Sequence, residues 1–152
     1  MINISDKDNI NNYLSKLDIN AMPVFGKMSP QHMIEHLSLI LIFSNGKKPM
    51  ELLISEEKSH RFKAYLIDND NVFPIGFKAP LIGDEPCPIK FENFEASKSV
   101  LFRELERFHN YFLENENATI MHPTLGPLDY REWIIFHNKH FTHHFKQFNL
   151  FK

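Results

Sequence analysis

WIIFHNKHFTHHFKQF, the stretch from residue 133 to residue 148, decides the predicted fold. It holds four of the nine histidines of the chain within eight consecutive residues. An α-helix turns by about 100° per residue, so His137, His140 and His144 share one ridge of such a helix with Trp133. We therefore expect these three imidazoles to face the core, and His143 to lie on the shoulder of the ridge.

The two sides of this helix differ in character. Apolar side chains flank the histidine ridge, whereas Lys139, Thr142 and Lys146 fall on the far side, which we expect to face solvent. Inward imidazoles one turn apart have two ordinary roles in proteins. They satisfy one another through water and carbonyl groups, or they jointly hold a divalent metal ion. The stretch therefore predicts a site without naming a reaction.

Length and composition describe an ordinary globular protein. The 152 residues suffice for one substantial core, so we predict a single domain over residues 1–152. The 15 phenylalanines help to fill a helical core. A formal net charge of −2 predicts no nucleic-acid partner and no patch for an anionic membrane surface. A small-molecule substrate remains the expected partner.

The sequence predicts a cytoplasmic protein. Its first ten residues have neither the basic nor the apolar region of a signal peptide, and the longest apolar run, residues 39–43, is too short to span a membrane. The single cysteine, Cys87, excludes an internal disulfide and fits a reducing compartment. No activating neighbour is evident beside it, so we do not expect a cysteine nucleophile.

Capping residues and apolar periodicity predict four main helices and one short one. Asp129 and Glu132 form the capping box that opens the last helix, and Ser29 followed by Pro30 opens the second. No stretch shows the period-2 alternation of a strand. We therefore predict an all-α fold, an antiparallel bundle of four main helices with an extra short helix. The other predicted helices begin after Ser5, after Ser55 for the short one, and from Asn93, and the second ends near residues 45–46.

A long loop rich in proline separates the second and third main helices. Residues 71–92 contain four prolines and two glycines, which excludes regular structure over most of this length. A loop this long in a small domain usually covers or binds something. We expect it to roof part of the cleft between the helices. Residues 122–127 are also rich in proline and glycine, and predict an ordered turn before the last helix.

A histidine of the second helix completes the candidate site. If the second and last helices face each other, His36, His140 and His144 converge between them. Three neutral imidazoles at about 2.0–2.1 Å would hold Zn²⁺ or a similar cation and leave positions open for water or substrate. The alternative is that all three are core or boundary histidines satisfied by hydrogen bonds. The predicted inward ridge of the second helix consists of His32, His36, Leu39 and Phe43.

Several motifs together resemble the DinB-like superfamily of four-helix-bundle proteins. The resemblance spans about residues 23–148, and its three-histidine spacing is the most specific part. One branch of that superfamily also shares the two motifs that contain proline. The motifs in this chain are Phe25-Gly26-Lys27-Met28-Ser29-Pro30, Glu35-His36-Leu37, His122-Pro123-x-x-Gly126-x-Leu128 and His140-x-x-His143-His144-x-x-Gln147.

The resemblance implies a fold, a metal and a class of chemistry. The expected fold is an up-down-down-up bundle, often a homodimer, with a divalent metal, most often nickel or zinc, on His36, His140 and His144. Some relatives resemble transferases or isomerases that conjugate a low-molecular-weight thiol to a small electrophile, and the branch with these motifs has no agreed substrate. Met28 stands where many members carry tryptophan. Our hypothesis is a metal-dependent thiol transfer or hydrolysis, with His137 as a proton carrier beside the metal.

Two other functions stay open. A non-catalytic bundle would use its histidines for structure or metal binding, or would act as a dimer. His32, Glu35 and His36 also match H-x-x-E-H, a zinc-protease signature, although Glu35 lies roughly 60–100° from the histidine ridge and no second glutamate ligand is evident. The remaining polar candidates have milder expected roles. We expect Gln147 to form a hydrogen bond between helices, and His122 to bond a loop carbonyl or to stand at the pocket mouth. His60 and His109 are expected at surface or boundary positions.

Overall fold

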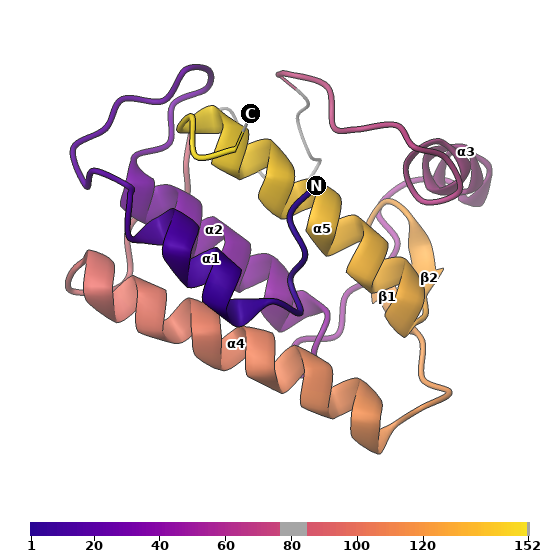
Figure 1. The fold of residues 1–152 in the computed structure, drawn as a ribbon. Coiled ribbons are helices and arrows are strands. Elements are labelled where there is room, and N and C mark those ends of the chain that lie inside the picture. Colours follow the sequence, from indigo (N-terminus) through magenta and orange to yellow (C-terminus); the bar gives the residue numbers. More distant parts are fainter. Residues whose placement is uncertain (77–84, 152) are drawn as a thin grey trace.

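The structure is a computed structural model that describes residues 1–76 and 85–151. The described chain is mostly helical, which confirms the predicted class in its broad form, and it also contains one small sheet. Part of the predicted Pro-rich loop, residues 77–84, lies outside the described residues. The elements are α1 (Lys7–Leu14), α2 (Pro30–Phe43), α3 (Glu56–Leu66), α4 (Phe94–Glu114), β1 (Ile120–His122), β2 (Gly126–Leu128) and α5 (Tyr130–Gln147) (Figure 1).

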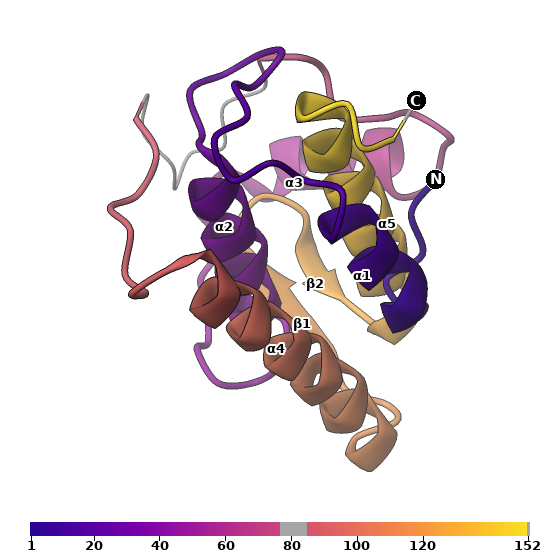
Figure 2. The ribbon, with the colours of Figure 1, turned by 60° about the vertical axis from the view of Figure 1, so that its left-hand side comes forward.

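Helices α1, α2, α4 and α5 run along one another, and α3 lies outside them, seen end-on in Figure 1. The view in Figure 2 agrees: α2 lies beside α4, and α1 beside α5. The buried apolar residues form one cluster, whose largest members include Met33 of α2, Phe108 of α4, and Trp133, Phe141 and Phe145 of α5. This cluster fixes α2 and α5, the two helices that carry the candidate ligands. No helix in the described part of the chain combines the length and the apolar character needed to cross a membrane.

The predicted helix starts agree closely with the structure. Asp129 caps α5, where its side chain accepts from the backbone N–H of Glu132, and the Glu132 side chain accepts from the N–H of Asp129. Ser29 caps α2 with Pro30 in the first helical position, and here His32 closes the capping box. Ser55 and Asn93 cap α3 and α4. Only α1 differs at its start, because Asp6 instead of Ser5 is its cap.

A short hairpin precedes α5, and the all-α prediction missed it. Strands β1 and β2 pair antiparallel, with Met121 opposite Pro127. Each strand has three residues, too few for the alternation that reveals a strand in a sequence. The ordered turn predicted at residues 122–127 is the bend of this hairpin. The indole N–H of Trp133 donates to the carbonyl of Ile120 at 3.3 Å, which ties the hairpin to α5.

The buried face of α2 differs from the predicted ridge. Met33, Ile34, Leu37 and Leu41 are fully buried, whereas the predicted ridge residues His32, His36 and Leu39 are only partly buried. These fully buried residues belong to the apolar cluster, and α2 packs mainly against α4. His36 therefore lies at the edge of the core, where it can face a cavity.

Helix α5 is also buried on part of the side that we expected to face solvent. Thr142 accepts from the backbone N–H of Ile2 at 2.8 Å, so the N-terminal segment covers it. The Lys139 ammonium group donates to the carbonyls of Leu66 and Asn69 at the end of α3, a favourable place for a cation. The prediction was wrong for Thr142 and Lys139 because both contacts come from distant parts of the chain. Lys146 is exposed as predicted.

Candidate metal centre

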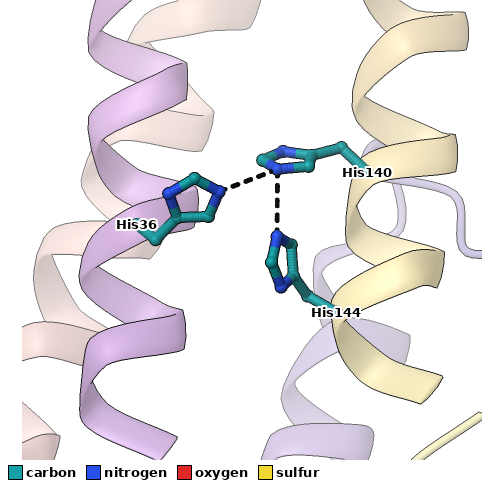
Figure 3. Close-up of side chains that lie close together, drawn as sticks. All are labelled: His36, His140 and His144. Carbon is teal, nitrogen blue, oxygen red and sulfur yellow. Dashed lines mark hydrogen bonds between the residues drawn. The ribbon is translucent and has the colours of Figure 1, made fainter. Parts of the chain in front are cut away.

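Three histidines from two helices converge on one point. His36 projects from α2 toward His140 and His144 of α5 (Figure 3). The Nε2 atom of His140 lies 2.9 Å from that of His36 and 3.1 Å from that of His144. All three potential ligand atoms lie within 4.8 Å of one another, and in the described part of the chain no other group of His, Cys, Asp or Glu does so. The three residues that the sequence predicted as ligands therefore lie together.

The spacing of these nitrogens fits a small cation. A tetrahedral zinc ion at about 2.0–2.1 Å from imidazole nitrogens separates them by about 3.3 Å. The separations of 2.9 and 3.1 Å from His140 are slightly shorter, and the third pair, His36 and His144, lies within 4.8 Å, so rotations of the rings would reach that geometry. Three ligands would leave at least one coordination position open, as in catalytic zinc sites.

Gln147 determines which nitrogen of His144 carries the proton. The Gln147 amide nitrogen donates to the carbonyl of Phe25 at 2.8 Å, which fixes the orientation of the amide. Its oxygen then faces Nδ1 of His144 at 3.0 Å, and must accept a proton from it. The lone pair of His144 is therefore on Nε2, the atom that faces the other two histidines. The predicted interhelical hydrogen bond of Gln147 was wrong, because one partner, His144, lies on the same helix and the other, Phe25, lies in a loop.

Hydrogen bonds alone satisfy this cluster poorly. Since Nε2 of His144 bears a lone pair, its contact with His140 requires a proton on Nε2 of His140. That proton must then be shared with Nε2 of His36, because one ring nitrogen carries one hydrogen. Nδ1 of His140 is buried without a hydrogen-bond partner among the described residues. A cation that accepts the lone pairs of all three Nε2 atoms removes this competition for one proton.

All three imidazoles are neutral at pH 7. Burial, and to a smaller extent the charge of nearby His143, lowers the pKa of His36 to about 4. Burial lowers the pKa values of His140 and His144 well below 6.5, and the neighbouring imidazoles add to the effect. Neutral imidazole is the form that binds metals. The electrostatics of the site therefore favour a ligand set over a set of protonated side chains.

The three histidines lie in the wall of a cavity of about 860 Å³. This volume is in the range of small-molecule sites, roughly 300–1,000 Å³. Its described lining is mainly apolar, and the only charged pair, Lys27 with Glu85, is exposed and ion-paired. Residues 73–76 and 85–86 belong to the lining, which confirms the roofing role for the described part of the Pro-rich loop. The aromatic and aliphatic lining residues include Phe25, Ile40, Phe43, Phe62, Tyr65, Phe73, Leu125, Trp133 and Phe136.

His137 is not brought to this cluster. Its side chain is fully buried, its ring stacks on Trp133 at 5.3 Å between centroids, and it does not belong to the cavity lining. Ser44 donates its hydroxyl to the carbonyl of Leu41, so it accepts from Nε2–H of His137 at 2.8 Å. Burial lowers the pKa of His137 to about 3. This geometry gives no support to the predicted proton carrier.

Glu35 is engaged away from the three histidines. Its carboxylate accepts from the backbone N–H groups of Lys90 and Phe91 at 2.7 and 3.2 Å, and from the hydroxyl of Ser97 at 3.1 Å. Glu35 therefore anchors the end of the Pro-rich loop against α4. His32 bonds to Ser29 at the start of α2. The H-x-x-E-H protease arrangement is thus not assembled, because neither residue joins His36.

Sequence reasoning missed part of the cavity wall. His143 was expected on the shoulder of the helix, but it lines the cavity, with its ring 5.2 Å from that of Phe25. His122, for which the pocket mouth was one of the two expected positions, lines the cavity as well and packs against Phe136 at 4.6 Å between ring centroids. Helical spacing contains a usable signal, since the α5 residues in the wall fall within an arc of roughly 100°. His60 is exposed as expected, and His109 is partly buried and bonds to Tyr130. The exposed Cys87 is outside the main cavity.

No family model matches this chain, and no curated protein or solved structure matches it. The resemblance to DinB-like proteins therefore rests on the motifs alone and stays a prediction. What the structure adds independently is a set of three converging imidazoles at the wall of an apolar cavity.

Proposed function

We propose that this chain is a DinB-like four-helix-bundle protein, with its main helices up-down-down-up, that binds one zinc or nickel ion and transforms a small apolar electrophile. The reaction class is thiol transfer or hydrolysis. The observation that carries the proposal is the convergence of His36, His140 and His144 in the wall of the cavity. A purely structural cluster does not need a cavity of this size beside it.

The residues of the site have separate roles in this proposal. His36, His140 and His144 hold the ion, and Gln147 keeps the lone pair of His144 directed at it. A bound zinc or nickel ion would supply Lewis-acid chemistry and would lower the pKa of a coordinated water or thiol. The aromatic walls exclude bulk water and position the substrate. The low-molecular-weight thiol and the homodimer stay predictions.

Metal analysis tests the first half of the proposal. Protein purified without a histidine tag should contain close to one divalent ion per chain, and His144→Ala should reduce this to a small fraction. His60→Ala is a matched control, because His60 is an exposed histidine on α3, and it should leave the metal content unchanged. Wild-type protein that takes up no zinc or nickel in dialysis, with a normal helical spectrum, would refute the metal centre.

A reaction screen tests the second half. Metal-loaded protein should accelerate the conjugation of cofactor thiols to small apolar electrophiles, or the hydrolysis of such electrophiles, and His144→Ala should abolish the acceleration. The alternative, a non-catalytic metal-binding protein, predicts full metal content and no acceleration with any thiol or with water. Metal content and rate therefore separate the two functions.

A further inference from the structure

His122 occupies a fixed position in the cavity wall, away from the three metal ligands. It is the last residue of β1, and its ring packs against Trp133 at 5.3 Å and Phe136 at 4.6 Å between centroids. Its Nδ1 atom faces the backbone N–H groups of Thr124 and Leu125 at 3.1 and 3.2 Å. The bend of the hairpin therefore holds the imidazole from one side.

These two contacts determine the protonation of the ring. Two N–H groups directed at Nδ1 require a lone pair there, so the proton is on Nε2. Burial lowers the pKa of His122 to about 3, so the ring is neutral over the physiological range. No residue in the described part of the chain accepts a hydrogen bond from Nε2, and this nitrogen is not among the fully enclosed unpartnered atoms. His122 therefore offers one N–H donor at the cavity wall.

An apolar surface separates this donor from the metal ligands. Phe136 packs against both sides of this region, with its ring centroid 4.6 Å from that of His122 and 5.4 Å from that of His140. Trp133 and Leu125 line the same region. The only charged side chains in the described lining, Lys27 and Glu85, are exposed. A ligand that reaches from the ion to His122 therefore lies along aromatic and aliphatic side chains.

We propose that Nε2–H of His122 is a second polar anchor of the cavity, and that the ligand is a mainly apolar, uncharged molecule with a carbonyl-type oxygen that accepts from it. The metal would bind the other end of the ligand, and in this respect the inference rests on the proposed function. A neutral donor in an apolar enclosure suits a ketone, ester or amide oxygen, which regains there the hydrogen bond that it loses on leaving water. A charged group would lose its hydration without a partner of opposite charge.

The test uses two probes that differ in the acceptor only. Acetophenone has a carbonyl oxygen where α-methylstyrene has a methylene group, and neither probe requires a metal. Binding is followed by the indole N–H signal of Trp133, the single tryptophan, in ¹H–¹⁵N spectra. The variant is His122→Asn, whose side-chain oxygen can still accept from the N–H groups two and three residues ahead, but whose amide is too short to replace the Nε2 donor.

The expected result is a difference between the two proteins in the ratio of the two affinities. The affinity for acetophenone divided by the affinity for α-methylstyrene should be about three- to tenfold higher in the wild-type protein than in His122→Asn. Comparing ratios cancels the greater hydrophobicity of α-methylstyrene. An equal ratio in the two proteins overturns the inference, and so does the absence of any response of Trp133 to both probes.

A second measurement does not depend on the variant folding. Long-range ¹H–¹⁵N correlations of the wild-type imidazoles should show His122 with its proton on Nε2, and a proton on Nδ1 overturns the inference. All these measurements are made in EDTA, so a failure of the metal centre leaves them interpretable. A protein that contains metal but gives a negative probe result contradicts the His122 anchor alone. A positive probe result in a protein that binds no metal contradicts the metal centre alone.

Discussion

Replacing Gln147 by methionine should weaken metal binding although Gln147 is not a ligand. Gln147 is buried in the last turn of α5, where it accepts from Nδ1–H of His144 at 3.0 Å and donates to the carbonyl of Phe25 at 2.8 Å. Methionine has a similar volume and makes neither bond. His144 is then free to place its proton on Nε2, and that proton must be removed before Nε2 can bind an ion.

The magnitude follows from the two lost hydrogen bonds. Loss of a group that orients a metal-bound histidine typically weakens metal affinity by 10- to 100-fold, which is about 1.4–2.7 kcal/mol. Nδ1–H of His144 and the carbonyl of Phe25 also lose their partners in a buried place, so the unfolding free energy of the metal-free protein should fall by about 2–4 kcal/mol. The two effects have separate measurements.

A second substitution separates orientation from stability. In Gln147→Glu the carboxylate still accepts from Nδ1–H of His144, and more strongly because it is charged, but it cannot donate to the carbonyl of Phe25. Metal affinity should therefore equal or exceed that of the wild type, while the unfolding free energy should fall by about 1–3 kcal/mol. The two variants should differ in metal affinity and agree in reduced stability.

Competition with a chromophoric chelator at pH 7.5 measures the affinity, and urea unfolding in EDTA measures the stability. Lys146→Met is the matched control, because Lys146 is the exposed neighbour of Gln147 on the same helix, and it should change neither quantity. If Gln147→Met binds the metal as tightly as the wild type, the Gln147 amide does not determine which nitrogen of His144 bears the lone pair. Equally weak binding in Gln147→Met and Gln147→Glu would show that loop position, not proton position, controls the site.

Three further predictions concern other parts of the structure. Gly26→Ala should weaken metal binding, as Gln147→Met does, because the new Cβ would lie 2.7 Å from the amide nitrogen of Gln147. Gly76→Ala, at a similar positive φ but in open space, is the control and should leave metal affinity unchanged in the chelator competition. Because the folded-state pKa of His137 is lowered to about 3 from 6.5, its neutral ring contributes stability that is complete above pH 6.5 and is lost as the pH falls toward 3. Urea unfolding in EDTA should show a smaller loss between pH 7.5 and pH 5 for His137→Gln than for the wild type, by about 2 kcal/mol, and an equal loss would contradict a buried neutral ring. Glu35→Gln should speed hydrogen exchange of the backbone amides of Lys90 and Phe91, which donate to Glu35, without changing metal content or any hydrolytic rate. Loss of hydrolysis alone would favour the H-x-x-E-H protease instead.

The helix boundaries could be predicted because capping chemistry is local. Ser29, Ser55, Asn93 and Asp129 each accept from an N–H group within three residues, so the sequence contains both partners of the interaction. Residues 120–128 form a hairpin that depends instead on the donation from Trp133 to Ile120 and on packing against α5. The burial of Lys139 depends on carbonyls some 70 residues away. Spacing along one helix contains no information about either contact.

The convergence of His36, His140 and His144 was predictable, but the orientation of α5 was only approximately so. The predicted ridge was centred close to Trp133 and included His137. The cavity wall occupies the arc from His143 through His140 to His144, and His137 begins the adjoining arc that faces the core. Because α5 is buried on both arcs, apolar periodicity cannot locate the border between core and cavity. The cavity wall is therefore displaced by roughly 40° around the helix from the predicted ridge, which brings His143 into the wall and leaves His137 outside it.

Low pKa values do not by themselves identify the functional histidines of this protein. Burial lowers the pKa of His137 as it does that of His140 and His144, yet only the latter two face the cavity. The difference is the direction of the lone pair. Nε2 of His137 carries a proton that Ser44 accepts, so its lone pair is on Nδ1, which is enclosed in the core without a partner among the described residues. Gln147 imposes the opposite tautomer on His144 and directs its lone pair toward two other imidazoles. The amide that follows His144 by three residues therefore distinguishes a candidate ligand from a packed histidine on the same helix.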